Sequence, residues 1–306
     1  MDTRWVGALV ASLLAFRLDG NRASAQELEP GAYAAAPVGL NVLIVSNTFN
    51  VGDVAFDPAA PLDDGRATIN NTAIGYGRAL NIAGRSAQAS FAVPFVAGHV
   101  EATVLGTPTA VTRLGAADPR MRFAVNLYGA PAMDIRTFAT TRPKRLLGAS
   151  VTIGTPLGSY SSERLVNLGT RRWAFKPEVG FSQIFGRWIV DTYAGVWLFT
   201  TNDHYFRDTV RSQDPIASLQ VHVHYAVTRR LIVSGNANFY EGGRTTIDGR
   251  RNVDLQRNSR VGATVVRPLS KGRTLRAAVS RGARTTIGAD FTSLSFAFQK
   301  AWGAGI

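Results

Sequence analysis

The chain of 306 residues has a formal net charge of +13, no cysteine and a mean hydropathy of +0.01. The absence of cysteine excludes disulfides and thiolate metal sites. A charge of this size is typical of nucleic-acid binding, but the Lys and Arg residues are dispersed and form no recognised binding motif, so we expect no nucleic-acid partner. Membrane headgroup phosphates, or anions inside a pore, explain dispersed arginines better.

The start of the chain has the three parts of a secretory signal peptide. Arg4 precedes an apolar stretch at 5–16, and Ala-Ser-Ala at 23–25 supplies the small residues of a cleavage site. The apolar stretch, roughly a dozen residues, is too short to cross a bilayer as a helix, which takes about 20 residues. We therefore predict three parts: a signal peptide at 1–25, a segment at 26–38 in the periplasm or in the lumen of the fold, and one folded domain at 39–306.

The mature chain divides into segments of about ten residues in which apolar side chains alternate with polar or small ones. Leu219, Val221 and Val223, for example, alternate with Gln220 and His222. A period of two, with turns alternately short and long, is typical of a transmembrane β-barrel. A sheet in lipid must close on itself because lipid offers no hydrogen bonds to its edges. We predict an all-β antiparallel barrel of about 12 strands, at 39–50, 67–80, 86–97, 119–128, 145–155, 172–184, 187–200, 214–226, 230–240, 258–267, 273–282 and 291–302.

An even number of strands returns both chain ends to the periplasm. Barrels of ten or fourteen strands are the alternatives, since the patterns at 39–50 and 98–117 are ambiguous. Aromatic residues near strand ends predict a girdle at the membrane interfaces: Trp173, Trp188, Trp197, Phe199, Tyr240, Phe298 and Trp302. The core of a soluble β-sandwich is the other interpretation of these rings, but twelve such strands would expose too much apolar surface in water.

The alternation also assigns each side chain to a face. Lipid-facing residues are predicted to include Val221, Val223, Ala263, Val265, Leu275, Val279, Leu294 and Phe296. Inward-facing residues are predicted to include Gln220, His222, Thr264, Arg276 and Ser295. Because a charge on the lipid face at midplane costs about 2–4 kcal/mol, Val223→Arg is predicted to impair assembly more than His224→Arg.

The candidate functional residues are the charged, aromatic and imidazole side chains of the lumen. They are Arg120, Arg122, Lys176, Glu178, Asp191, Tyr193, Trp197, His222, His224, Arg260 and Arg276. Two interpretations remain open. Opposed charges inside a barrel can form a ladder that fills the lumen, or they can form a constriction that selects solutes.

Asp191 interrupts an otherwise apolar strand and shares its inward face with Tyr193 and Trp197. A carboxylate beside two aromatic rings could bind an aromatic solute and accept a hydrogen bond from its hydroxyl. The alternative is that Asp191 only neutralises a Lys or Arg of the lumen. If the site serves solutes, Asp191→Asn and Trp197→Ala should change solute flux without preventing folding.

Catalytic and metal-binding patterns are weak in this sequence. His222 and His224 share one face of a strand, about 7 Å apart from strand rise, but no third ligand accompanies them, so we expect no metal. No Ser/His/Asp setting or G-x-S-x-G elbow is present, and we expect neither an enzyme nor a cofactor. The glycine-rich stretch at 241–246 ends a strand and predicts a loop bend, not a phosphate loop.

Several segments together resemble the bacterial family of transporter-like proteins linked to the meta-pathway of phenol degradation. These segments lie at 118–122, 126–131, 167–178, 193–199 and 242–246. The run Arg-Trp-Ala-Phe-Lys-Pro-Glu at 172–178 is the most specific of them, and the resemblance extends over about 27–302. It implies a barrel in the outer membrane of a Gram-negative bacterium, associated with aromatic catabolism.

Two functions follow as expectations. The first is a monomeric outer-membrane channel or transporter for small solutes, aromatic or otherwise hydrophobic. The second is a non-transporting structural or adhesive barrel whose external loops bind lipopolysaccharide or a partner. A clear path through the lumen favours the first, and a plug of paired charges favours the second.

Overall fold

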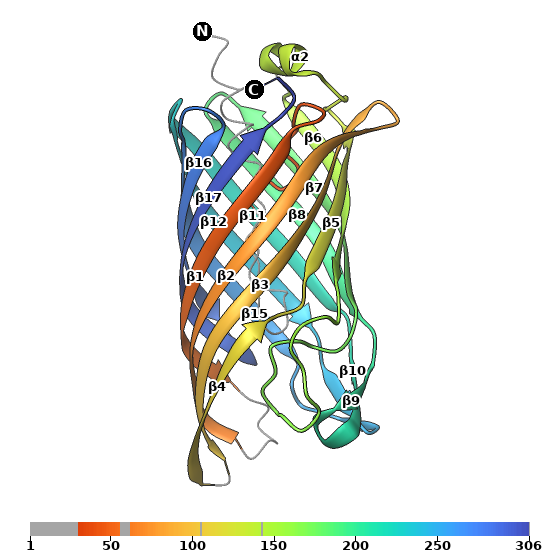
Figure 1. Ribbon diagram of the computed structural model, residues 1–306, viewed down its shortest axis with the longest axis vertical. Helices are drawn as coiled ribbons and strands as arrows, with labels where there is room; N and C mark the ends of the chain where they lie inside the picture. The colour runs from red at the N-terminus through yellow and green to blue at the C-terminus, as the bar shows by residue number, and fades with distance from the viewer. Residues whose placement is uncertain (1–29, 56–61, 105, 142, 306) are drawn as a thin grey trace.

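The computed structural model of the protein describes residues 30–55, 62–104, 106–141 and 143–305. Twelve antiparallel strands form the wall of a closed barrel (Figure 1), which confirms the predicted fold and strand number. Around the wall these are β1 (Asn41–Ala55), β2 (Leu62–Ile82), β3 (Arg85–Val104), β5 (Arg120–Tyr128), β6 (Arg145–Gly154), β7 (Ala174–Phe185), β8 (Trp188–Phe199), β11 (Ile216–Thr228), β12 (Leu231–Gly242), β15 (Gln256–Pro268), β16 (Arg273–Arg284) and β17 (Gly288–Trp302). The ring closes where β1 pairs with β17, from Asn41 opposite Trp302 to Ala55 opposite Gly288. The predicted signal peptide and the start of the 26–38 segment lie outside the described residues.

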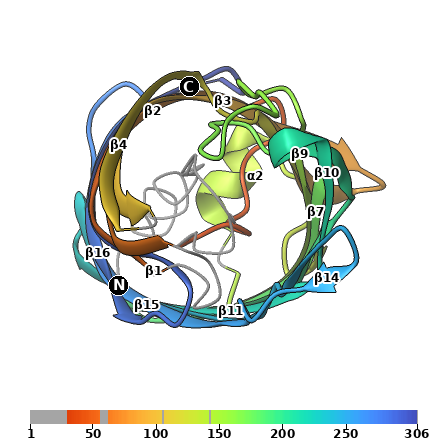
Figure 2. The same ribbon diagram turned by 90° about the horizontal axis from the view of Figure 1, so that it is seen from below.

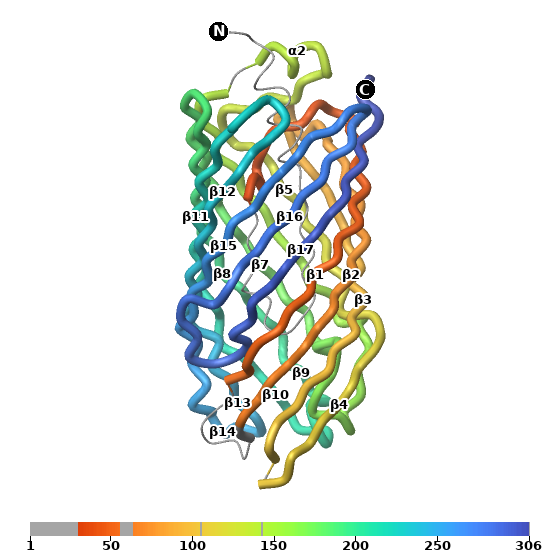
Figure 3. Tube along the Cα trace, turned by 90° about the vertical axis from the view of Figure 1, so that its left-hand side faces the viewer, coloured from red at the N-terminus to blue at the C-terminus, as the bar shows by residue number. Residues whose placement is uncertain are grey.

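The ambiguous stretch at 98–117 is a hairpin, not a further strand of the wall. β4 (Thr107–Ala116) folds back on β3, from Phe95 opposite Ala116 to Val104 opposite Thr107. Among the described strands, β4 pairs with β3 alone. The hairpin therefore extends the sheet beyond the barrel, at the lower end of the molecule in Figures 1 and 3.

The two ends of the barrel differ in the length of their connections. The start of β1, the end of β17 and α2 (Ile135–Thr140) lie at the upper end in Figure 1. There Ala83 and Gly84 join β2 to β3 with positive φ angles of 50° and 76°, as a two-residue hairpin turn requires. The lower end carries most of the long described connections, at 155–173, 200–215 and 243–255, while the connection at 129–144, which holds α2, lies at the upper end. By the rule of short periplasmic turns and long external loops, the upper end is periplasmic.

The long external connections have some structure of their own. A small second sheet joins β9 (Asn202–Tyr205), β10 (Thr209–Gln213), β13 (Thr245–Ile247) and β14 (Arg250–Arg251). Seen from below, these elements stand at the rim of the barrel (Figure 2). Within the described residues, no helix is long and apolar enough to cross a membrane.

The side chains alternate across the wall as the sequence predicted. On β11, Leu219 and Val223 are 42% and 38% exposed on the outer face, whereas Gln220 and His222 are 1% and 0% exposed on the inner face. The apolar face meets lipid, and the closed ladder leaves no sheet edge in the bilayer.

The predicted aromatic girdle is right for four residues and wrong for three. Trp173, Trp188, Phe298 and Trp302 are exposed on the outside. Trp197 and Tyr240 are instead buried in the lumen around Ile216, and Phe199 packs against them. All three stand near strand ends, but the parity of their strands turns their side chains inward.

One group of polar side chains lies on the outer face. Asn47 Nδ2 donates to Asn70 Oδ1 at 2.8 Å and to Thr72 Oγ1 at 2.9 Å, between β1 and β2. These bonds satisfy amide groups that lipid would leave without partners.

The depth dependence of the lipid face can be tested on β11. Val223→Arg places a charge near the middle of the strand, where it should destabilise the barrel by about 2–4 kcal/mol. Val227→Arg, on the same face near the periplasmic end, should cost only about 0–1 kcal/mol. This pair is a cleaner comparison than His224→Arg, because His224 is bonded to Asp191. Reversible unfolding in lipid vesicles gives both values, and equal losses would contradict the assigned depth.

Candidate functional site

A short segment before β1 lies inside the barrel and forms the centre of the candidate site. We call residues 31–36 the N-terminal strap. At the periplasmic end, Val38 N donates to Met133 O at 2.8 Å and Gly39 N donates to Ala79 O at 3.0 Å. From there the strap extends into the lumen, where Tyr33 is buried.

Tyr33 lies flat on a shelf made by two glycines of neighbouring strands. Gly148 of β6 and Gly180 of β7 are paired in the sheet and face inward. A Cβ atom at Gly148 would stand 2.3 Å from Tyr33 Cδ1, and one at Gly180 would stand 2.1 Å from Tyr33 Cε2. Only glycine therefore allows the ring to approach the sheet this closely.

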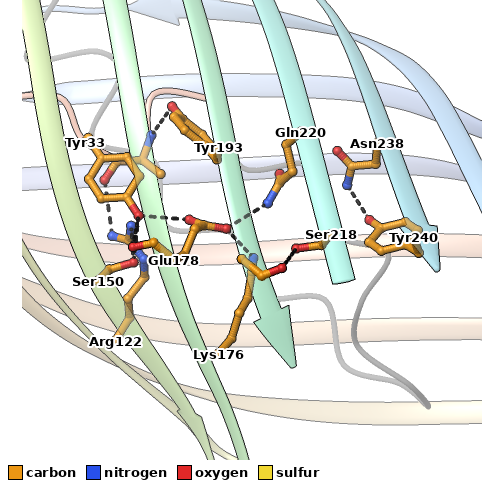
Figure 4. Close-up of polar contacts among 12 residues, drawn as sticks. Tyr33, Arg122, Ser150, Lys176, Glu178, Tyr193, Ser218, Gln220, Asn238 and Tyr240 are labelled. Atoms are coloured by element: carbon orange, nitrogen blue, oxygen red, sulfur yellow. Dashed lines mark hydrogen bonds and ion pairs between the residues drawn. The ribbon is translucent and has the colours of Figure 1, made fainter. Parts of the chain in front are cut away.

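Polar contacts hold the edge of the Tyr33 ring (Figure 4). Its hydroxyl donates to Glu178 Oε1 at 3.0 Å and lies 2.8 Å from Ser150 Oγ. Arg122 donates to Ser150 Oγ and to the Ala32 carbonyl, both at 3.1 Å. Its guanidinium lies 4.9 Å from the centre of the Tyr33 ring, a distance typical of a cation–π contact.

Asp191 fixes the other end of the strap. Its Oδ2 accepts hydrogen bonds from Gly31 N at 3.1 Å and from the Tyr193 hydroxyl at 2.8 Å. His224 Nε2 lies 3.0 Å from the same oxygen. The Tyr193 hydroxyl in turn accepts from Ala32 N at 3.1 Å. The strap thus binds to a carboxylate and a phenol that belong to the barrel wall.

These contacts differ from both sequence interpretations of Asp191. The carboxylate is occupied by the chain's own backbone and by Tyr193, so its Oδ2 is not open to the hydroxyl of a solute. Its ionisable partner is His224 rather than a Lys or Arg. β8 and β11 are neighbours in the sheet, and their register places Asp191 opposite His222. His224 is the next inward residue of β11, so its ring reaches the Asp191 carboxylate diagonally.

A buried ion pair lies beside the strap. Lys176 Nζ and Glu178 Oε2 are 2.7 Å apart, with side chains 3% and 2% exposed. Gln220 Nε2 also donates to Glu178 Oε2, at 3.2 Å. Removing one partner of such a pair would leave the other charge buried without a counter-ion, which is strongly destabilising. The pair therefore restricts which side chains can replace either residue.

Trp197 stands on the external side of this layer. Lys176 Nζ lies 5.7 Å from the centre of its ring, and the guanidinium of Arg120 lies 6.0 Å from it. Both cations are thus within reach of the π-face of the indole. Trp197, Arg120 and Lys176 form an aromatic and cationic group toward the outer mouth.

The remaining candidates lie in two other places. His222 Nδ1 bonds Asn236 Oδ1 at 2.9 Å, within a row of polar side chains across β11 and β12. Arg260 of β15 bonds Ser280 Oγ at 3.0 Å and the Phe291 carbonyl at 2.9 Å, which links it to β16 and β17. Arg276 is buried on the same wall. The described residues contain no group of three His, Asp or Glu side chains suited to a metal ion.

Sequence reasoning missed Tyr33, Ser150 and the glycine shelf. The strap has no periodicity that would predict a docked segment. The glycines did carry a signal, because inward glycines on consecutive strands often mark a close approach of other atoms. That signal becomes specific only once the register places Gly148 opposite Gly180.

The closed barrel, its apolar outer face and its polar lumen define a class: a transmembrane β-barrel of the Gram-negative outer membrane. Within that class the chain belongs to the family described as "Putative MetA-pathway of phenol degradation", whose model matches residues 46–296. This match confirms the family resemblance of the sequence.

A solved structure with a high TM-score shares the fold, and two others match more weakly. The crystal structure of an outer membrane channel from Pseudomonas putida F1 is 21% identical, with a TM-score of 0.76 over 90% of this chain and 100% of that chain. The β domain of the Bordetella autotransporter BrkA is 13% identical, with a TM-score of 0.49 over 85% and 98% of the two chains. KdgM porin is 7% identical, with a TM-score of 0.45 over 85% and 99%. No curated protein matches the chain.

The glycine shelf can be tested by a double-mutant cycle. Gly148→Ala should destabilise the folded protein by about 1–3 kcal/mol, because its methyl group displaces the Tyr33 ring. In a Tyr33→Ala background the same change should cost much less, since all three atoms nearest the new Cβ belong to Tyr33. Chemical unfolding of the four proteins in lipid vesicles gives the interaction energy. An equal cost in both backgrounds would show that the ring does not rest on Gly148.

Proposed function

We propose that the protein is a monomeric channel through which small solutes, aromatic or otherwise hydrophobic, cross the outer membrane. The observation that carries the proposal is the polar inner wall. Inward positions of β11 and β12 hold hydroxyl, amide and imidazole groups, at Ser218, Gln220, His222, His224, Ser234, Asn236 and Asn238. Membrane insertion requires only an apolar outer face, and a polar inner face of this kind is the one that lines the lumen of channel barrels. Here these side chains are packed against neighbouring groups and are 6% exposed or less.

The strap sets the width of the proposed passage. Tyr33 lies on the inner wall of β6 and β7, and its hydroxyl is held by the Ser150 and Glu178 side chains and by the Glu178 carbonyl. A solute that passes this level meets the Tyr33 ring and the guanidinium of Arg122. Asp191 and His224 act as positioning residues, because they hold the backbone of the strap.

Trp197 supplies the feature that favours aromatic solutes in this proposal. Its ring faces Arg120 and Lys176 near the outer mouth. A flat apolar solute could take the place of these cations on the indole face. Aromatic rings pack favourably there in offset-stacked or edge-to-face arrangements. Arg260 and Arg276 would face the same passage from the opposite wall, between β15 and β17.

One observation favours the alternative of a non-transporting barrel. Lys176 and Glu178 are paired and almost fully buried, and Tyr33 and Gln220 pack onto Glu178. A layer of this kind suits a lumen that is filled for stability, with external loops that bind lipopolysaccharide or a partner. The two functions differ in one measurable property, which is conductance.

Planar-bilayer recordings separate them. The wild-type protein should give discrete conductance steps, and Tyr33→Ala should raise the step size because it removes the ring that narrows the lumen. Flux of benzyl alcohol into liposomes should rise in parallel. If both proteins remain silent while their heat-resistant barrels are intact, the channel proposal fails and the structural role stands.

Asp191 and Trp197 should affect transport in different ways. Asp191→Asn removes the charge that faces His224, so the strap should loosen and conductance should become larger or noisier. Trp197→Ala should lower aromatic flux relative to the flux of glycerol, with the strap unchanged. Asp203→Asn, in an exposed external strand, serves as the matched control. Normal transport by both lumen variants would remove these residues from the solute path.

A further inference from the structure

The outer mouth contains a cavity that the proposed pore does not use. It has a volume of about 400 Å³ and lies between the inner face of the β3–β4 hairpin, the connection at 155–173 and the strands β9 and β10. β9 and β10 stand at the rim of the barrel in Figure 2. The volume falls within the range of small-molecule sites. We call this space the outer-mouth cavity.

One wall of the outer-mouth cavity is apolar. Val100, Val104 and Val111 line it from the hairpin, and Leu165 and Leu168 line it from the 155–173 connection. Leu168 is buried against the side chains at the end of the barrel. This wall offers a surface to the apolar body of a ligand.

Two arginines line the other side. Arg172 is 5% exposed, and its guanidinium lies 4.3 Å from the centre of the Phe199 ring. Its Nη2 donates to Gln213 Oε1. Its Nη1 is buried and has no hydrogen-bond partner among the described residues. An unsatisfied buried donor of this kind is costly, more so when it carries charge.

The charge of Arg172 is only partly balanced by the described residues around it. Burial, and then the neighbouring Arg211, lower the pKa of Arg172 to about 9, which means that its charged form is poorly stabilised. The nearby carboxylate of Asp118 is already engaged. Its Oδ1 accepts from Gly158 N at 2.8 Å, and its Oδ2 accepts from Thr170 N at 2.8 Å and from Thr170 Oγ1 at 2.6 Å.

The hydrogen bonds of Asp118 also hold the walls of the outer-mouth cavity in place without a ligand. Asp118 ties the 155–173 connection to the start of β5 at both Gly158 and Thr170. Asn202 Nδ2 donates to the Tyr160 hydroxyl at 3.0 Å and to the Thr170 carbonyl at 3.1 Å, which joins the connection to β9. A ligand would therefore pay little to order this loop on binding.

We propose that the outer-mouth cavity binds a small amphiphilic carboxylate. The carboxylate accepts hydrogen bonds from Arg172 and Arg211, and the apolar body packs on Val111 and Leu168. Arginine suits this task because its planar fork matches a carboxylate. The cavity lies on the inner face of the hairpin, away from the lipid surface, so the occupant is a free solute rather than a lipid-borne phosphate.

The experiment uses the full-length barrel in a non-ionic detergent, with trans-cinnamate as the probe and titration calorimetry as the readout. A single site for cinnamate is expected. Arg211→Gln should weaken its affinity by at least about tenfold, because one charge-assisted hydrogen bond is lost. Leu165→Gln should weaken it as well. Arg164→Gln, an exposed change in the same connection and outside the cavity, should leave the affinity unchanged.

Arg211→Gln is the deciding variant, because Arg211 is only partly buried, whereas replacement of the buried Arg172 would leave a gap beside Phe199. Absence of cinnamate binding, or equal affinity in wild type and Arg211→Gln, overturns the site. If cinnamyl alcohol binds as tightly as cinnamate, the claim that the site recognises a carboxylate is wrong. If inorganic phosphate competes as strongly as cinnamate, the claim that the ligand needs an apolar body is wrong.

The site does not rest on the proposed channel. Intact cinnamate binding with no flux into liposomes would leave this site standing and remove the channel. Normal flux with no cinnamate binding would remove this site and leave the channel standing.

Discussion

The fold depends on one constraint: in the hydrocarbon core, every backbone N–H and C=O group must find a partner within the protein. The pairing of β1 with β17 meets this constraint, since it joins the first and last strands along the full length of β1. Once the ring is closed, the alternation of side chains along each strand decides which of them face lipid and which face the lumen. The small group of outward amides on β1 and β2 obeys the same rule, since these amides bond one another.

The lumen follows different physics from the wall. Here the polar groups are buried by one another and by the strap, so each needs a defined partner, as Glu178 has in Lys176, Gln220 and Tyr33. Low exposure strengthens these interactions and raises the cost of breaking them. The result is a layer whose geometry is narrowly specified. The external cavity differs again, because there a buried guanidinium keeps one donor that none of the described residues satisfies.

Most of the barrel could be predicted from sequence because alternation is local: ten consecutive residues suffice to show it. Register is not local, and this explains what was missed. Asp191 meets His224 only because β8 and β11 are neighbours in the sheet. Gly31 bonds a carboxylate 160 positions away, and nothing in the composition of the strap indicates that partner. Trp197 and Tyr240 failed as girdle residues because nearness to a strand end says nothing about the face a side chain occupies.

The strap also bears on how the barrel assembles. It lies just before β1, yet most of its partners belong to β5, β6, β7 and β8, in the middle of the chain. The strap therefore ties the start of β1 to the middle of the chain through contacts that do not involve β17, the strand that closes the ring. Because the strap touches only the inward faces of these strands, its contacts mark the concave side of the sheet independently of the closing pair.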